Sequence, residues 1–419
     1  MGYRPGSEPG GPSARRGGSH RPWPGHRLQP VSSRTTRLAL IALLLLATAG
    51  LSPISSARAT PKPTGAERVR GDQWHLAFLN VPRAHRISQG EGVTVAIPDT
   101  GVDPHPDLRG NLLRGTDIVP GGSGDGQQDR DSHGTSMAGL IAAHGQGANT
   151  GALGIAPKAK ILPIRSRIIN TEGDTETLAA SVEWAISHGA DVISISAVAG
   201  ASARLQRAIR AALQANIVVV AAAGNRPEDI GVGYPASEEG VIAVGGVDQA
   251  GVHAAVAVTG LEIDVVAPAV GIYSTSYDGK YSEGNGTSGA TAIVAGAAAL
   301  IRAKYPYLPP EEVVHRLTAT AVDKGRPGRD DEYGYGVIDL VAALTADVPP
   351  LGFQSEAATS PSDGHSITTA TAEPASSAGA DSSTARGLAT LGVIVAASAG
   401  YLLWRRRRNA HDPPPRISR

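Results

Sequence analysis

The chain contains no cysteine among its 419 residues. This absence excludes a disulfide framework, a zinc site built from thiolates and a cysteine nucleophile. The sequence also lacks an EF-hand loop and a His-Glu-x-x-His motif, so we expect neither a metal site nor a cofactor. A calcium ion held by backbone carbonyl oxygens remains compatible with the sequence, because such a site leaves no motif.

Acidic residues are nearly missing from both ends of the chain. Residues 1–58 carry 8 arginines against one acidic residue, and residues 386–419 carry 7 against one. The middle therefore holds 23 basic and 36 acidic groups, a net charge of about −13. An acidic middle argues against a nucleic-acid-binding protein, and basic ends fit a protein that crosses a membrane.

Two apolar segments near the ends carry no charged residue. Leu38–Leu51 is about 14 residues long, which suits a signal peptide but falls short of the ~20 residues that a spanning helix needs. We expect residues 1–57 to be a signal peptide with a long basic n-region, the alternative being an uncleaved anchor. Residues 387–404 would cover about 27 Å as a helix, and four arginines follow them. We expect one transmembrane helix there and a basic cytoplasmic tail over residues 405–419.

The region between these segments divides by composition. Residues 346–386 are rich in Ser, Thr, Ala and Pro and cannot bury enough apolar surface to fold, so we expect a disordered linker. Residues 58–71 are expected to be a short N-terminal extension. The remainder, 72–345, is long enough for one large folded domain. The expected topology is that of a single-pass protein of the cell membrane with this domain outside the cell.

Short runs of β-branched and other apolar residues recur through residues 72–345. They are 93–97, 160–164, 192–195, 217–220 and 241–244. Because these runs are almost continuously apolar, they predict strands covered on both faces, as in a parallel sheet. Apolar residues at helical spacing over 175–188 and 205–213 predict helices between some of the strands. Strands that alternate with helices indicate an α/β fold with a doubly wound, mostly parallel sheet.

Three polar clusters interrupt this background. Asp99 follows the first predicted strand, His133 lies in Asp-Ser-His-Gly-Thr, and Ser288 lies in Gly-Thr-Ser-Gly. A serine hydroxyl needs an adjacent base to act as a nucleophile, and an imidazole suits that role near neutral pH. A carboxylate can then hold the imidazole in one tautomer, so the three residues are candidates for a catalytic triad. Asn225, in Ala-Ala-Gly-Asn, is a candidate donor to an oxyanion, together with the Ser288 N–H.

Each of these motifs alone has an ordinary structural explanation. The sequence at Asp99 could form a turn, His133 could simply begin a helix, and Ser288 could be an N-cap. Their occurrence together, in one order on one α/β chain, favours catalysis.

The three clusters resemble the three signature motifs of the subtilases, the subtilisin-like serine peptidases. The resemblance covers about residues 72–344 and implies that Asp99, His133 and Ser288 are the triad and that Asn225 donates to the oxyanion. Within the family, the plan of leader, catalytic domain, linker, span and basic tail is most similar to the mycosins. That resemblance implies a cell-envelope serine endopeptidase that cleaves proteins or peptides and is associated with a membrane complex of type VII secretion.

The sequence departs from the family's pattern at three positions, of which Ala292, where the family usually has proline, should be tolerated. Pro98 precedes Asp99 where the family usually has an aliphatic residue, and we expect strand pairing to stop there because proline has no N–H. Ser196, Ala197 and Val198 lie where the family lines its substrate pocket, and Val198 replaces the usual glycine. These departures support a rival hypothesis, in which the protein is a scaffold that stabilises a secretion complex without proteolysis.

Other polar residues near the motifs are expected to have no catalytic role. His105 resembles the structural turn that follows the family's first motif. Asp129 and Asp131 precede His133 in a polar, Gly-rich segment, where we expect their carboxylates to be solvated.

Overall fold

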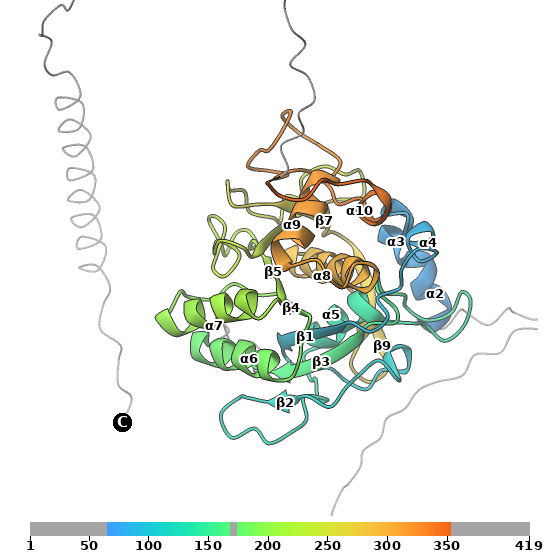
Figure 1. The fold of residues 1–419 in the computed structure, drawn as a ribbon. Coiled ribbons are helices and arrows are strands. Elements are labelled where there is room, and N and C mark those ends of the chain that lie inside the picture. The colour runs from blue at the N-terminus through green and yellow to red at the C-terminus, as the bar shows by residue number, and fades with distance from the viewer. Residues whose placement is uncertain (1–64, 168–173, 353–419) are drawn as a thin grey trace, which may run out of the picture. The chain divides into compact units, whose positions relative to one another are not determined.

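A parallel β-sheet runs through the folded part of the chain (Figure 1). The computed structural model describes residues 65–167 and 174–352. Within them, the main sheet has seven strands in the order β2-β3-β1-β4-β5-β6-β7, and neighbouring strands are parallel. The strands are β1 (Thr94–Asp99), β2 (Thr116–Asp117), β3 (Lys160–Arg165), β4 (Val192–Ile195), β5 (Val218–Ala222), β6 (Ile242–Val247) and β7 (Val265–Pro268).

Helices cover both faces of this sheet (Figure 1). On one side lie α5 (His133–Ala142) and α8 (Thr287–Lys304), and on the other lie α6 (Thr175–Ser187) and α7 (Ala203–Gln214). Successive side chains of a strand point to opposite faces of the sheet. Val218 and Val220 therefore pack with α5 and α8, while Val219 packs with α6 and α7. The doubly wound, mostly parallel sheet predicted from the apolar runs is therefore confirmed.

Smaller elements surround this core. A two-stranded antiparallel sheet, which the sequence did not predict, is formed by β8 (Ile272–Ser276) and β9 (Lys280–Gly284). The remaining helices are α2 (Gly65–Asp72), α3 (Trp74–Phe78), α4 (Val81–Ala84), the 3₁₀ turn η1 (Pro106–Leu108), α9 (Pro310–Ala319) and α10 (Leu340–Thr345).

Strand β1 continues through Pro98. The expectation that strand pairing stops at this residue is therefore wrong for the pairing of β1 with β3. Pro98 and Asp99 both pair with β3, whereas pairing with β4 ends at Ala96. The Asp99 carbonyl accepts from the Ser166 N–H at 2.8 Å on the β3 side. Alternate residues of a parallel strand bond to opposite neighbours, so the donor that Pro98 lacks faces β4. The pairing of β1 with β3 therefore continues up to Asp99, at the carboxyl end of the sheet.

The expected signal peptide, transmembrane helix and cytoplasmic tail lie outside the described residues, as does the expected linker from residue 353 on. The first residues of that linker, 346–352, are described, and the Leu351 N–H donates to the Glu312 carboxylate at 2.7 Å. Within 65–167 and 174–352, no helix combines the length and the apolar character that crossing a membrane requires. Part of the expected N-terminal extension is described and forms α2, which packs against β8 and β9. The Arg70 side chain fastens this helix by donating from Nε to the Gly151 carbonyl at 3.0 Å.

Candidate active site

The side chains singled out from the sequence meet at the carboxyl end of the parallel sheet. Asp99 is the last residue of β1, Asn225 lies three residues beyond β5, and His133 and Ser288 lie in the first turns of α5 and α8. His133, Asn225 and Ser288 line the same two cavities, of about 520 and 550 Å³. Strands end and helices begin at this edge, which is where doubly wound sheets place their sites.

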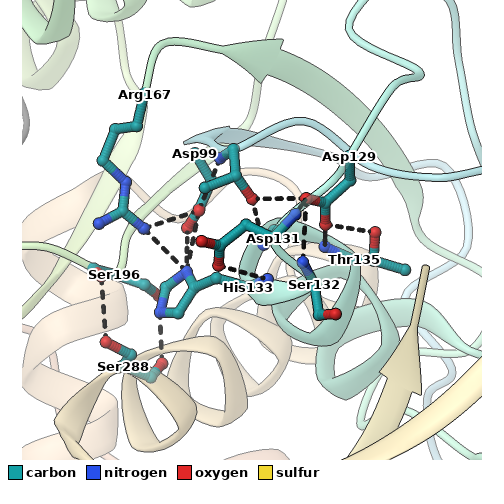
Figure 2. Close-up of polar contacts among 11 residues, drawn as sticks. Asp99, Asp129, Asp131, Ser132, His133, Thr135, Arg167, Ser196 and Ser288 are labelled. Atoms are coloured by element: carbon teal, nitrogen blue, oxygen red, sulfur yellow. Dashed lines mark hydrogen bonds and ion pairs between the residues drawn. The ribbon is translucent and has the colours of Figure 1, made fainter. Parts of the chain in front are cut away.

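Asp99 and His133 form a hydrogen-bonded pair (Figure 2). The imidazole Nδ1 lies 2.8 Å from both carboxylate oxygens, and Asp99 is only 1% exposed. Burial alone would raise the pKa of Asp99, but the charges of Arg167 and His133 outweigh it and hold that pKa well below its usual range. An ionised Asp99 fixes a proton on Nδ1 and leaves Nε2 available as a base.

Ser288 lies beside this pair, below the imidazole in Figure 2. Its hydroxyl donates to the main-chain carbonyl of Ser196 at 3.0 Å, and the Ser196 hydroxyl donates to the Ser288 carbonyl at 3.1 Å. The serine hydroxyl is therefore directed at Ser196 and not at His133. Hydrogen bonds of a catalytic serine often tighten only when the substrate binds, so this arrangement is compatible with a nucleophile.

Asn225 is held by its side-chain oxygen. Oδ1 accepts from the Thr287 N–H at 2.8 Å and from the Thr287 hydroxyl at 3.2 Å, so the NH₂ group is the end left to face the cavities. The Ser288 N–H is also available, because the first N–H groups of a helix have no intrahelical acceptor. Gly286 has a φ of 136°, and a Cβ there would lie 3.2 Å from Asn225 Oδ1. Glycine thus lets the chain turn tightly past the amide.

A buried carboxylate–imidazole pair, a serine at a helix N-terminus and an amide donor are the parts that acyl transfer requires. The chain matches the model of the subtilase family over residues 90–336. It belongs to the subtilase family. It is a subtilisin-like serine endopeptidase, as the sequence motifs predicted.

This subtilase is similar to both alkaline proteases and mycosins. The thermostable alkaline protease of Halalkalibacterium halodurans is 37% identical over 267 residues, which cover 63% of this chain and 71% of that protein. The solved structure of MycP1 with its N-terminal propeptide removed is 32% identical with a TM-score of 0.60, covering 66% of this chain and 98% of that one. The structure of the MycP3 protease from the type VII (ESX-3) secretion system is 33% identical with a TM-score of 0.59, covering 68% and 90%.

Asp129 of this subtilase is buried, so the expectation of a solvated carboxylate is wrong for it. Its exposed fraction is 4%. It accepts five hydrogen bonds, from the hydroxyls of Thr100 and Thr135 and from the N–H groups of Asp131, Ser132 and Thr135. These bonds fix the turn before α5, in which Ser132 has a φ of 91°, unusual for a residue other than glycine. Asp129 therefore holds the turn that places His133. Asp131 is half-buried and accepts from the His133 N–H at 3.3 Å.

We expect Asp129→Ala to lower the free energy of unfolding by about 3 kcal/mol or more, because it leaves several buried donors without an acceptor. The turn before α5 should loosen, and kcat/KM should fall about tenfold or more with it. Denaturant unfolding and steady-state kinetics measure the two effects. Asp131→Ala is the matched control, with an expected loss of stability below about 1 kcal/mol. Equal stability of both variants would show that Asp129 does not hold the turn.

His105 is structural, as expected. It is fully buried, its Nδ1 accepts from the Asp107 N–H at 3.0 Å, and its Nε2 lies 3.0 Å from the Lys280 carbonyl. Burial lowers the pKa of His105, which favours the neutral ring that these two bonds require. The side chain thus ties η1 to β9.

The predicted substrate-pocket residues Ser196, Ala197 and Val198 follow β4 and line the 550 Å³ cavity together with His133 and Ser288. A Cβ added to Gly233 would lie only 2.4 Å from Val198 Cγ1. The valine side chain therefore fills the space above that glycine.

Arg167 is a residue of the site that the sequence did not reveal. Its Nη2 lies 2.8 Å from Asp99 Oδ1 (Figure 2), and its side chain lines the 550 Å³ cavity together with Ser288. The charge of Asp99 raises the pKa of Arg167. No motif marks this arginine, and only the register that pairs Asp99 with Arg165 brings it to the Asp99–His133 pair. In the described part of the chain, no group of three or more His, Asp or Glu side chains is placed to hold a metal ion.

Proposed function

We propose that Asp99, His133 and Ser288 are the catalytic triad of this endopeptidase and that Asn225 helps bind the oxyanion. The observation that carries the proposal is the hydrogen-bonded Asp99–His133 pair beside a serine in the first turn of a helix. Ser288 Oγ attacks the peptide carbonyl, while His133 Nε2 takes its proton and later gives it to the leaving amine. The Asn225 amide and the Ser288 N–H donate to the oxygen that becomes negative.

A fluorophosphonate probe tests the nucleophile in the full-length protein. We expect the wild-type chain to be labelled at Ser288, as located by peptide mass spectrometry, and the Ser288→Ala variant to remain unlabelled. A folded wild-type protein that does not react would contradict the triad and would favour the scaffold hypothesis.

The stretch from Ser196 to Val198 is proposed to bind the substrate side chain that precedes the cut. Since Val198 fills the space above Gly233, small side chains such as alanine should be preferred. We expect Val198→Gly to raise kcat/KM for a leucine or phenylalanine at this position about tenfold relative to alanine, a value within the range for a few methyl groups in an apolar pocket. Competition between the paired peptides measures the ratio, and an unchanged ratio would place this pocket elsewhere.

The enzyme is further proposed to be anchored in the cell membrane with its catalytic domain outside, and to be associated with type VII secretion. Residues 1–57 and 387–419 support the anchoring by their sequence, and the similarity to MycP1 and MycP3 supports the association. Membrane fractionation and digestion of intact cells by added protease test the topology. Complementation of a deletion strain with Ser288→Ala tests whether secretion needs proteolysis or only the presence of the protein.

A further inference from the structure

Arg167 is fixed against the Asp99–His133 pair by both its backbone and its side chain. The N–H groups of Ser166 and Arg167 donate to the Asp99 carbonyl at 2.8 and 3.2 Å. The guanidinium then turns back to the carboxylate of the same residue, with Nη2 2.8 Å from Oδ1. The side chain is 20% exposed, so solvent screens this ion pair only in part.

The same guanidinium nitrogen also lies 2.9 Å from His133 Nδ1 (Figure 2). Arginine nitrogens only donate hydrogen bonds. When Nδ1 carries the proton that it gives to Asp99, two donors therefore face each other across this distance. When the imidazole gains its second proton during catalysis, two cations face each other across the same distance.

We propose that Arg167 is a positioning residue that shares the Asp99 carboxylate with His133 and disfavours the imidazolium, so that the enzyme keeps its catalytic base at lower pH than it otherwise would. This inference rests on the proposed triad. It adds a regulator of the base to that triad, supplied by the segment after β3.

The charged groups around His133 set the direction of the effect. Asp99, Asp131 and Asp129 lie on the side of β1 and the turn before α5, and Glu228 and Asp229 line the cavity from the segment after β5. These carboxylates all favour the imidazolium, although Asp229 is engaged by the Asn225 N–H at 2.7 Å. Arg167 is the cation that contacts the ring in the described part of the chain. After its removal, only the carboxylates, which favour the imidazolium, act on the ring.

The test is the pH dependence of kcat/KM for a peptide substrate, measured with the full-length protein. Arg167→Gln keeps a hydrogen-bond donor but loses the charge, and we expect the midpoint of its acid limb to rise by about one pH unit. Arg167→Lys keeps the charge, so its midpoint should stay close to that of the wild type. Arg165→Gln is the matched control, because Arg165 lies two residues before Arg167, at the end of β3, but pairs with Asp117 at 2.7 Å.

An unshifted midpoint in Arg167→Gln would overturn the proposal, as would equal shifts in the glutamine and lysine variants or in the Arg165 control. Should Arg167→Gln fail to fold, Arg167→Met takes its place, since it keeps an aliphatic stem without the charge. The NMR titration of His133 in the Ser288→Ala background should show the same rise without any turnover. Failure of the triad would appear separately, as activity or probe labelling that survives Ser288→Ala.

Discussion

Replacing Ser288 with alanine should lower kcat by about 10⁶-fold, the loss measured in a subtilisin, another member of the family, when the serine or the histidine is removed. The alanine removes the nucleophile but keeps the helix, because the side chain takes no part in holding α8 beyond its bond to Ser196. The catalysis that remains should come only from substrate binding and from the oxyanion donors. Steady-state kinetics on a peptide substrate measure the loss.

Removing a second member of the proposed triad should not add to this loss. His133→Ala together with Ser288→Ala should be about as slow as either alone, because each change already abolishes the same proton transfer. Ser187→Ala, on the exposed surface of α6, is the control and should leave kcat unchanged. A Ser288→Ala enzyme that retains more than a few per cent of the wild-type kcat would show that another residue is the nucleophile.

Asp99 differs from the other two because it also neutralises Arg167. Asp99→Asn should lower kcat by about 10⁴-fold by allowing the wrong imidazole tautomer. It should also destabilise the fold, since Arg167 is left largely buried without its counter-ion. The proposed triad thus includes an ion pair with Arg167 that the sequence motifs do not describe.

The fold could be predicted from the sequence where local composition determines structure. Strands β4, β5 and β6 are buried on both faces, and their continuous apolar runs show it directly. The hairpin of β8 and β9 was missed because β9 reads Lys-Tyr-Ser-Glu-Gly and is largely exposed, with no apolar pattern. Its position is determined by tertiary contacts, and it supplies Ser282 and Gly284 to the wall of one cavity.

Those residues of the candidate site that belong to sequence motifs could be predicted. Asp129 and Arg167 could not, for two different reasons. The burial of Asp129 follows from the hydrogen bonds that close the turn before α5, and a polar, Gly-rich segment gives no sign of it. Arg167 reaches Asp99 only because β1 and β3 are parallel neighbours in a particular register, which no single segment encodes.

Asn225→Ala should lower kcat by about 10²–10³-fold with little change in KM, which is the loss measured when an oxyanion-binding amide was removed from a subtilisin. In its proposed role, the amide donates to an oxygen that is negative only in the transition state, so its removal should affect the chemical step and not the binding of substrate. Kinetics with one peptide over a range of concentrations separate the two parameters.

The Asn225 side chain also accepts from the Thr287 N–H, so a loss of activity in the alanine variant could have a structural cause. Asn225→Asp separates the two roles. The aspartate keeps an acceptor for Thr287 but has no N–H to offer and brings a negative charge towards the oxyanion. If donation is the role of Asn225, the aspartate variant must be at least as slow as the alanine variant while its stability stays close to that of the wild type. An aspartate variant that recovers the wild-type kcat would assign Asn225 to holding α8 and would leave the oxyanion to the Ser288 N–H.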